Sequence, residues 1–97
     1  MVDTVRLAIT SRSTDDDIRA RVHEWVDEFV PASWRAAAPG GRNAIRAVRP
    51  RAEYESWYRT FADSGLAVAT WPVEYLGLDL TPEQARVAEA VLALRRV

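Results

Sequence analysis

The side chains best suited to catalysis or metal binding are few in this sequence and are not grouped. His23 is the only histidine and cysteine is absent, so no multi-histidine zinc site, thiolate ligand or cysteine nucleophile is possible. A Ser-His-acid triad would have to use His23, and the sequence contains no Gly-x-Ser-x-Gly turn to carry its serine. We therefore interpret His23 as a surface residue of a helix.

Two acidic features also have simpler interpretations than catalysis. Asp15, Asp16 and Asp17 are consecutive, so on a helix they point in different directions and suit its positive N-terminal end better than a cation. Glu74 lies in an aromatic segment and has no partner acid or base nearby in the sequence, which general acid–base chemistry would need. The sequence thus predicts no catalytic residue and no metal ligand.

The basic residues are concentrated in the middle of the chain. All 13 cationic side chains are arginines, the formal net charge is −1, and residues 31–51 contain five arginines and no acid. Arg42, Arg46, Arg49 and Arg51 would suit contacts with the phosphates of a nucleic acid or a coenzyme, but the glycines beside them match neither a P-loop nor a dinucleotide fingerprint. We favour a solvated basic connector at Arg42–Arg51, with phosphate contact as the alternative. The slightly negative total charge disfavours nucleic acid.

Hydrophobic periodicity predicts an all-α fold with three main helices, at about 14–30, 51–64 and 81–96. Thr14 is expected to cap the first helix, and Gly65 to end the second in a left-handed conformation. The third helix has the clearest start, with Thr81 as cap and Gln84 three residues later as a capping box. Six apolar residues are expected to meet in one core: Trp25, Phe29, Trp57, Phe61, Val91 and Leu92.

The segments between these helices are predicted to be irregular. Residues 1–13 form an N-terminal arm, in which the alternation of Val5, Leu7 and Ile9 would also suit a short edge strand. Residues 31–50 are a connector broken at Pro39–Gly41, and Ala36–Ala38 could form a short turn of helix before that break. Residues 66–80 are an apolar, aromatic loop. The third helix has no recognisable stop signal before Val97. There is no secretory signal and no apolar run of about 18 residues, so we expect a cytoplasmic protein with no membrane contact.

The aromatic loop carries a more specific pattern. It reads Gly-Leu-Ala-Val at 65–68 and then Trp-Pro-Val-Glu-Tyr-Leu-Gly at 71–77, followed by the third helix. Together with the first two predicted helices, this resembles the N-terminal helical domain of acyl-CoA dehydrogenases. In that family a helix ends in a Gly-Leu step and leads through a Trp-Pro-x-Glu-Tyr-Gly-Gly segment into a further helix. The resemblance covers roughly residues 14–93, so residues 14–97 are expected to form part of such a domain.

The resemblance assigns the family motif to five residues, which also form the expected partner surface: Trp71, Pro72, Glu74, Tyr75 and Gly77. Leu76 departs from the pattern, because the family usually has the first glycine of the pair at this position. Glycine is normally chosen there for a positive φ or a close backbone approach.

For an assembled enzyme the resemblance implies an FAD-dependent oxidoreductase of lipid metabolism that acts on CH–CH groups of acyl-CoA. The middle β domain and the C-terminal helical bundle, which carry the catalytic glutamate and most of the flavin site, have no counterpart in this sequence. No catalytic residue or flavin contact is therefore transferred, and the isolated chain is expected to be a truncated or split member without activity. Its expected partners are the remaining dehydrogenase domains, another subunit or a second copy of itself. The alternative is a non-catalytic helical interaction module that kept only the scaffold.

Overall fold

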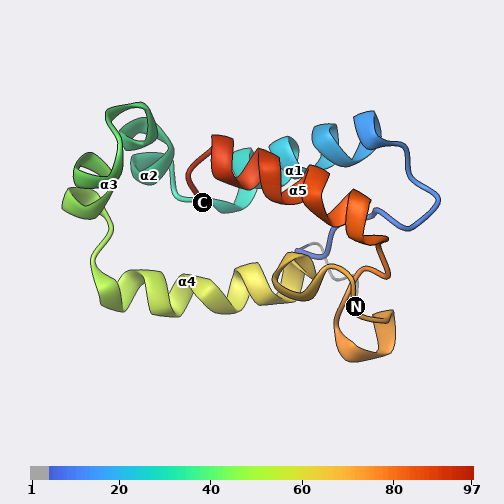
Figure 1. Ribbon diagram of the computed structural model, residues 1–97. Helices are drawn as coiled ribbons and strands as arrows, with labels where there is room; N and C mark the ends of the chain where they lie inside the picture. Colours follow the sequence, from blue (N-terminus) through green and yellow to red (C-terminus); the bar gives the residue numbers. More distant parts are fainter. Residues whose placement is uncertain (1–4) are drawn as a thin grey trace.

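The computed structural model describes residues 5–97, and this part of the chain contains helices and turns but no strand. The all-α prediction is therefore confirmed for the described residues. Figure 1 shows five α-helices: α1 Asp15–Phe29, α2 Ala32–Ala37, α3 Arg42–Val48, α4 Arg51–Ser64 and α5 Pro82–Leu94. Three single 3₁₀ turns lie between them: η1 Ala38–Gly40, η2 Leu66–Val68 and η3 Val73–Tyr75. Within this range no helix is both long enough and apolar enough to cross a membrane.

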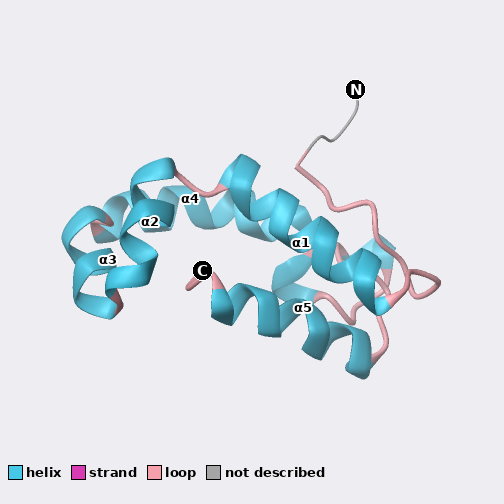
Figure 2. Cartoon of the chain, turned by 90° about the horizontal axis from the view of Figure 1, so that it is seen from above, coloured by secondary structure: helices cyan, strands magenta, loops and turns pink. Residues whose placement is uncertain are grey.

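Helices α1 and α5 lie side by side and run in the same direction (Figures 1 and 2). At their beginnings, the side-chain amide of Gln84 donates to the backbone oxygens of Ser11 and Ser13, at 2.9 and 3.1 Å. Towards their ends, Arg95 donates hydrogen bonds to Asp27 and to the ring of His23. The two helices are thus joined by polar contacts at both ends and by apolar packing between them.

The predicted helix starts are confirmed in their capping geometry. The Thr14 hydroxyl accepts a hydrogen bond from the backbone N–H of Asp17 at 3.0 Å, so α1 begins as expected. At α5 the capping box is complete: the Thr81 hydroxyl accepts from the Gln84 N–H at 3.2 Å, and the Gln84 side chain accepts from the Thr81 N–H at 2.9 Å. Side chains thereby satisfy backbone donors that the first turn of a helix leaves free.

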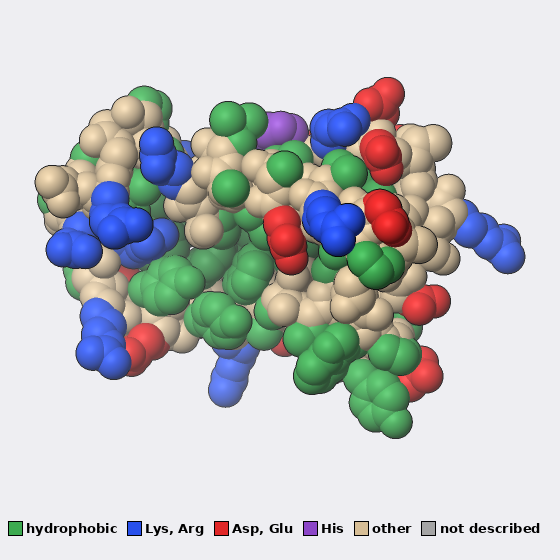
Figure 3. Space-filling view, in the orientation of Figure 1, with side chains coloured by type: hydrophobic (Ala, Val, Ile, Leu, Met, Phe, Trp, Pro, Cys, Tyr) green, Lys and Arg blue, Asp and Glu red, His purple; other side chains and the backbone are tan. Residues whose placement is uncertain are grey.

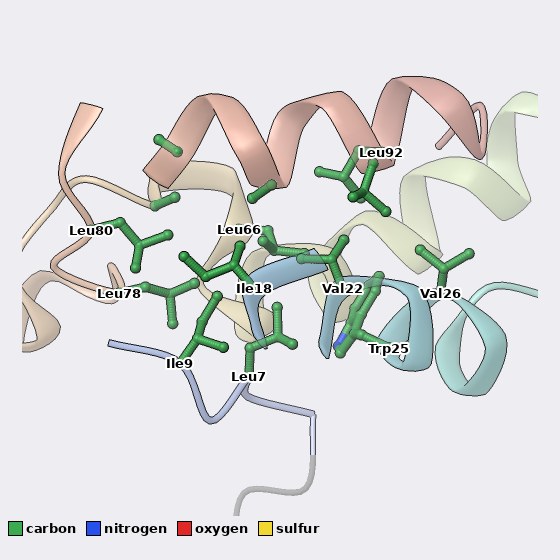
Figure 4. Close-up of a cluster of buried hydrophobic side chains, with 14 of the residues drawn as sticks. Leu7, Ile9, Ile18, Val22, Trp25, Val26, Leu66, Leu78, Leu80 and Leu92 are labelled. Carbon is green, nitrogen blue, oxygen red and sulfur yellow. The ribbon is translucent and has the colours of Figure 1, made fainter. Parts of the chain in front are cut away.

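The hydrophobic core lies between α1, α5 and the loops beneath them (Figure 4). Of the six predicted core residues, Trp25, Val91 and Leu92 are buried, while Phe29, Trp57 and Phe61 are half-buried and pack against the same cluster. Other buried members of the cluster come from elements spread along the chain: Ile18, Val22 and Val26 of α1, Leu66 of η2, Leu78 and Leu80 of the aromatic loop, and Ala85 and Ala88 of α5.

Helix α4 packs through its aromatic face. The Trp57 ring stacks on Phe61 with centroids 5.8 Å apart and meets the Trp25 ring of α1 at 6.0 Å. The Trp57 indole N–H also donates to the backbone oxygen of Phe29, the last residue of α1, at 2.8 Å. Aromatic contacts and this partly buried hydrogen bond therefore hold α4 against α1.

The first described residues form part of this core. Leu7 and Ile9 are buried, the Leu7 N–H donates to the Ser64 oxygen at 3.2 Å, and the Trp25 indole N–H donates to the Val5 oxygen at 2.7 Å. The alternation of Val5, Leu7 and Ile9 thus marks an extended segment with one buried face. This segment forms no β-ladder with any other of the described residues. The first four residues of the predicted arm lie outside the range that the structure describes.

The three predicted main helices are present as α1, α4 and α5, but the predicted connector contains two further helices, α2 and α3. These helices have only six and seven residues, too few to show an apolar stripe in the sequence. Each is instead held by one buried side chain, Trp34 in α2 and Ile45 in α3. Gly41, with φ of 86°, makes the turn between them.

The prediction that the third helix runs to residue 96 without a stop signal also needs correction, since α5 ends at Leu94. Arg96 adopts the left-handed conformation with φ of 57°, its N–H donates to Ala93, and the Val97 N–H donates to Leu92 at 3.0 Å. This is the hydrogen-bond pattern of a Schellman cap. The cap was hidden in the sequence because arginine occupies the position where glycine is usual.

Candidate functional site

Residues 71–80 of the aromatic loop form a closed structure with backbone hydrogen bonds of their own. The Asp79 N–H donates to the Trp71 oxygen at 2.9 Å, so the loop returns to its starting point. The N–H groups of Leu78 and Leu80 both donate to the Ala69 oxygen, at 3.2 and 3.1 Å, and their side chains are buried in the core. The loop is therefore anchored at its base, and its tip has a defined shape.

The backbone at the tip has the conformations that favour glycine. Leu76 is left-handed, with φ of 71° and ψ of 11°, although it carries a side chain. Gly77 is buried, and a Cβ added there would lie 2.0 Å from the backbone oxygen of Trp71, which is far inside van der Waals contact. Residues 76 and 77 thus require a positive φ at the first position and a missing side chain at the second.

Four large apolar side chains of the tip face solvent. Trp71 is 54% exposed, Val73 56%, Tyr75 65% and Leu76 67%. In Figure 3 a projecting group of hydrophobic side chains occupies the lower right of the molecule, where Figure 1 shows the loop before α5. A rigid apolar projection of this kind is typical of a surface that another polypeptide covers.

The structure separates the five predicted motif residues into two groups. Trp71, Pro72, Glu74 and Tyr75 are exposed on the tip, whereas Gly77 is buried and shapes the backbone. No hydrogen bond or ion pair of the Glu74 carboxylate is seen among residues 5–97, so it has neither the partner nor the enclosure of a catalytic acid.

Sequence reasoning missed three contributors to this loop. Val73 and Leu76 extend the exposed apolar surface, and the Arg6 guanidinium donates to the Gly77 oxygen, which ties the N-terminal segment to the tip. Leu76 had one visible signal, its departure from the glycine pattern. Arg6 had none, because the contact joins residues that are distant in the sequence.

His23 has a structural role at the contact between α1 and α5. It is half-buried, and the Arg95 guanidinium lies 3.0 Å from its Nδ1. Arginine can only donate, so Nδ1 is assigned as the acceptor and the ring proton to Nε2. The hydrogen bond from Arg95 is the main cause that lowers the pKa of Asp27. Burial is the second cause and raises the pKa, and the charges of Arg95 and Arg35 lower it by smaller amounts.

The acidic residues between positions 5 and 97 form no metal site. Among the described residues, no group of three or more His, Cys, Asp or Glu side chains is placed to hold a metal ion. Asp15, Asp16 and Asp17 lie exposed in the first turn of α1, and Asp16 pairs with Arg19 at 2.9 Å. Their arrangement agrees with the predicted capping role.

The basic segment is not a uniform solvated connector. Three of its arginines line one surface hollow of about 460 Å³, together with residues from the end of α5; the lining residues are Arg42, Ile45, Arg46, Arg49, Ala93, Arg96 and Val97. Arg51 does not take part and instead pairs with Glu55 on α4 at 2.9 Å. Folding has thus brought Arg96, from the C-terminal end of the sequence, next to the three arginines from its middle.

Among the described residues, the apolar tip of the aromatic loop and the arginine-lined hollow are the main features on which a function can be based. They lie on different parts of the surface, the first beside the start of α5 and the second beside its end. Comparisons of the chain with models of protein families, with curated proteins and with solved structures give no match.

Proposed function

We propose that this chain is the helical scaffold of an acyl-CoA dehydrogenase-like enzyme and acts only when assembled with the rest of that enzyme. The aromatic loop would be the docking surface for the middle β domain and the C-terminal helical bundle, whether these belong to the same or to another polypeptide. By resemblance, the assembled enzyme is a cytoplasmic, FAD-dependent oxidoreductase that acts on CH–CH groups of acyl-CoA. The catalytic glutamate and the flavin contacts come from the partner.

The backbone at residues 76 and 77 is the observation that carries this proposal. The family has a Gly-Gly pair at this point of its Trp-Pro-x-Glu-Tyr segment, and the present loop has the two backbone conditions that such a pair satisfies. Leu76 keeps the left-handed conformation in spite of the strain that a Cβ adds there. The geometry therefore supports a loop of the dehydrogenase type in which the first glycine has been replaced.

The exposure of the tip supports the need for a partner. Trp71, Val73, Tyr75 and Leu76 are all more than half exposed, and the fold below them is already closed by Leu78 and Leu80. Rearrangement within the described chain would therefore have to break the loop's hydrogen bonds to Ala69 to cover them. A second polypeptide covers the same surface without that cost.

The test is co-purification with the product of an adjacent dehydrogenase-like gene, followed by an absorbance spectrum. A complex with flavin absorbance is expected from the mixture and none from the chain alone. Replacing Trp71 and Tyr75 by serine should abolish the complex. The control Leu94→Ser, which removes an apolar side chain of α5 that is also more than half exposed, should leave it intact. A complex that survives the double substitution would refute docking through the loop.

A second candidate is a non-catalytic interaction module, and the aromatic face of α4 favours it. Tyr58 is 44% exposed beside the half-buried Phe61, with ring centroids 5.6 Å apart, so a second apolar surface is open to a protein partner or to a second copy of the chain. Sedimentation distinguishes the two functions. A stable dimer without flavin that ignores the dehydrogenase partner would favour this module.

A further inference from the structure

The arginine-lined hollow lies between α3 and the end of α5. Arg42, Arg46 and Arg49 come from α3 and its C-terminal cap, and Arg96 comes from the cap of α5. Figure 3 shows basic side chains gathered at the left of the molecule, on the side where Figure 1 places α3. The volume of the hollow, about 460 Å³, lies in the range of small-molecule sites.

The charges of the hollow are uncompensated within the described part of the chain. No acidic residue lines it, and none of its four arginines forms an ion pair with residues 5–97. Arg19, Arg21 and Arg51, by contrast, each pair with a carboxylate on their own helix. Four cations gathered in one hollow repel one another, and a bound anion would remove that repulsion.

The fold places the guanidinium group of one of these arginines and fixes the backbone of another. The Arg49 guanidinium lies over the rings of Tyr54 and Trp34, at 4.8 and 5.5 Å from their centroids, and is half-buried. Arg96 occupies the left-handed position of the Schellman cap, next to the free carbonyl groups that favour a cation at a helix C-terminus. The site is therefore partly organised before any ligand arrives.

The rest of the lining is apolar. Ile45 is buried beneath the hollow, and Ala93 and Val97 form its side towards α5. A bare inorganic ion would contact only the guanidinium groups, whereas a larger molecule would also cover this apolar side. The combination suits an anion with several charged oxygens attached to an organic group.

We propose that the hollow binds a small organic phosphate carrying two or more phosphate groups. Guanidinium groups form paired hydrogen bonds with phosphate oxygens, and several of them around one hollow match a diphosphate better than a single carboxylate. An extended nucleic acid would need a basic surface beyond the hollow, and the chain has a net charge of −1. This inference does not depend on the proposed function, because no residue of the aromatic loop lines the site.

The experiment is calorimetric titration of the intact chain with inorganic pyrophosphate and with ADP, at low and at physiological salt. The pocket variant is Arg46→Gln with Arg96→Gln. The control is Arg59→Gln with Arg86→Gln, which removes the same charge at exposed positions outside the hollow. Circular dichroism verifies that both variants fold. A single Arg42→Gln variant provides an independent check.

The parent and the control should bind both probes, with ADP tighter than pyrophosphate because its nucleoside covers the apolar side. The pocket variant should bind them roughly tenfold or more weakly for each guanidinium removed. Equal binding by all three proteins, equal loss in both double variants, or no binding by the parent would each overturn the proposal. Tight binding of single-stranded DNA without binding of pyrophosphate would overturn it as well, in favour of a nucleic-acid surface.

Discussion

The tip of the aromatic loop allows the effects of φ and of close contact to be measured separately. Gly77→Ala adds a methyl group 2.0 Å from the Trp71 oxygen, and this oxygen cannot move away without weakening its hydrogen bond to Asp79. We expect Gly77→Ala to lower the free energy of unfolding by about 2–3 kcal/mol, the usual cost of forcing an extra group into a packed site. For a domain of this size that corresponds to a melting temperature lower by roughly 10 °C or more.

Leu76→Gly should behave in the opposite way. Relief of the left-handed conformation of Leu76 gains about 1–2 kcal/mol. The greater freedom of an unfolded glycine removes about 0.5–1 kcal/mol of this gain, and an exposed leucine loses little burial. The expected net change is between zero and about 1.5 kcal/mol of stabilisation, whereas truncation of a leucine in ordinary backbone is destabilising.

Gly41 supplies the matched control. It has a φ of 86°, and a Cβ added there meets nothing within 4 Å, so Gly41→Ala measures the cost of positive φ alone, about 1–2 kcal/mol. All three variants are compared with the parent by urea and thermal unfolding. A Gly77→Ala protein that melts like the parent, or a Leu76→Gly protein less stable by more than about 1 kcal/mol, would refute the geometry of the tip.

The remaining predictions concern the contacts that hold the helices together. Trp57→Ala should lower the free energy of unfolding by about 3 kcal/mol, at the low end for tryptophan because the ring is half-buried. A variant whose urea denaturation matches that of the parent would show that Trp57 is not part of the core. Gln84→Ala should cost about 2 kcal/mol against about 1 for Thr81→Ala, since Gln84 also joins α5 to the segment before α1; equal losses in thermal unfolding would contradict this link. The pKa of Asp27 is lowered by Arg95, so the stabilisation is complete above the ordinary aspartate pKa and is lost as the pH falls through the lowered value. Melting temperatures of Asp27→Asn should therefore fall less than those of the parent as the pH is lowered from neutral through the ordinary aspartate range, and parallel curves would exclude the contribution.

The features predicted best were those set by local chemistry. Thr14 and Thr81 cap their helices, and Gly65 ends α4 in the left-handed conformation, because each depends on residues within a few positions of itself. Gly65 also shows a limit of such rules. The Leu66 N–H reaches the buried Ser64 hydroxyl, which in turn donates to the Phe61 oxygen, so a side chain replaces one backbone bond of the Schellman pattern.

The features that were missed depend on partners distant in the sequence. Helices α2 and α3 are too short for periodicity to identify them, and tertiary contacts such as the burial of Trp34 and Ile45 stabilise them. The burial of Leu7 and Ile9 depends in the same way on the core formed by other elements.

The candidate sites follow the same division. Trp71 and Tyr75 were recognised from a local motif and do lie exposed on the loop tip. The arginine-lined hollow could be recognised only from the fold, because packing of the chain brings Arg96 next to α3. Arg51 does not line the hollow and instead pairs with Glu55. A contiguous basic run therefore could not reveal which of its members share a site.

The central claim, that this chain completes an acyl-CoA dehydrogenase-like enzyme, is tested most directly by one absorbance spectrum. The purified chain is measured alone and after mixing with the product of an adjacent dehydrogenase-like gene and repurification. A flavin spectrum that appears only in the co-purified mixture is the predicted result. A mixture that separates into a colourless chain and an unchanged partner would contradict the claim and favour the interaction module.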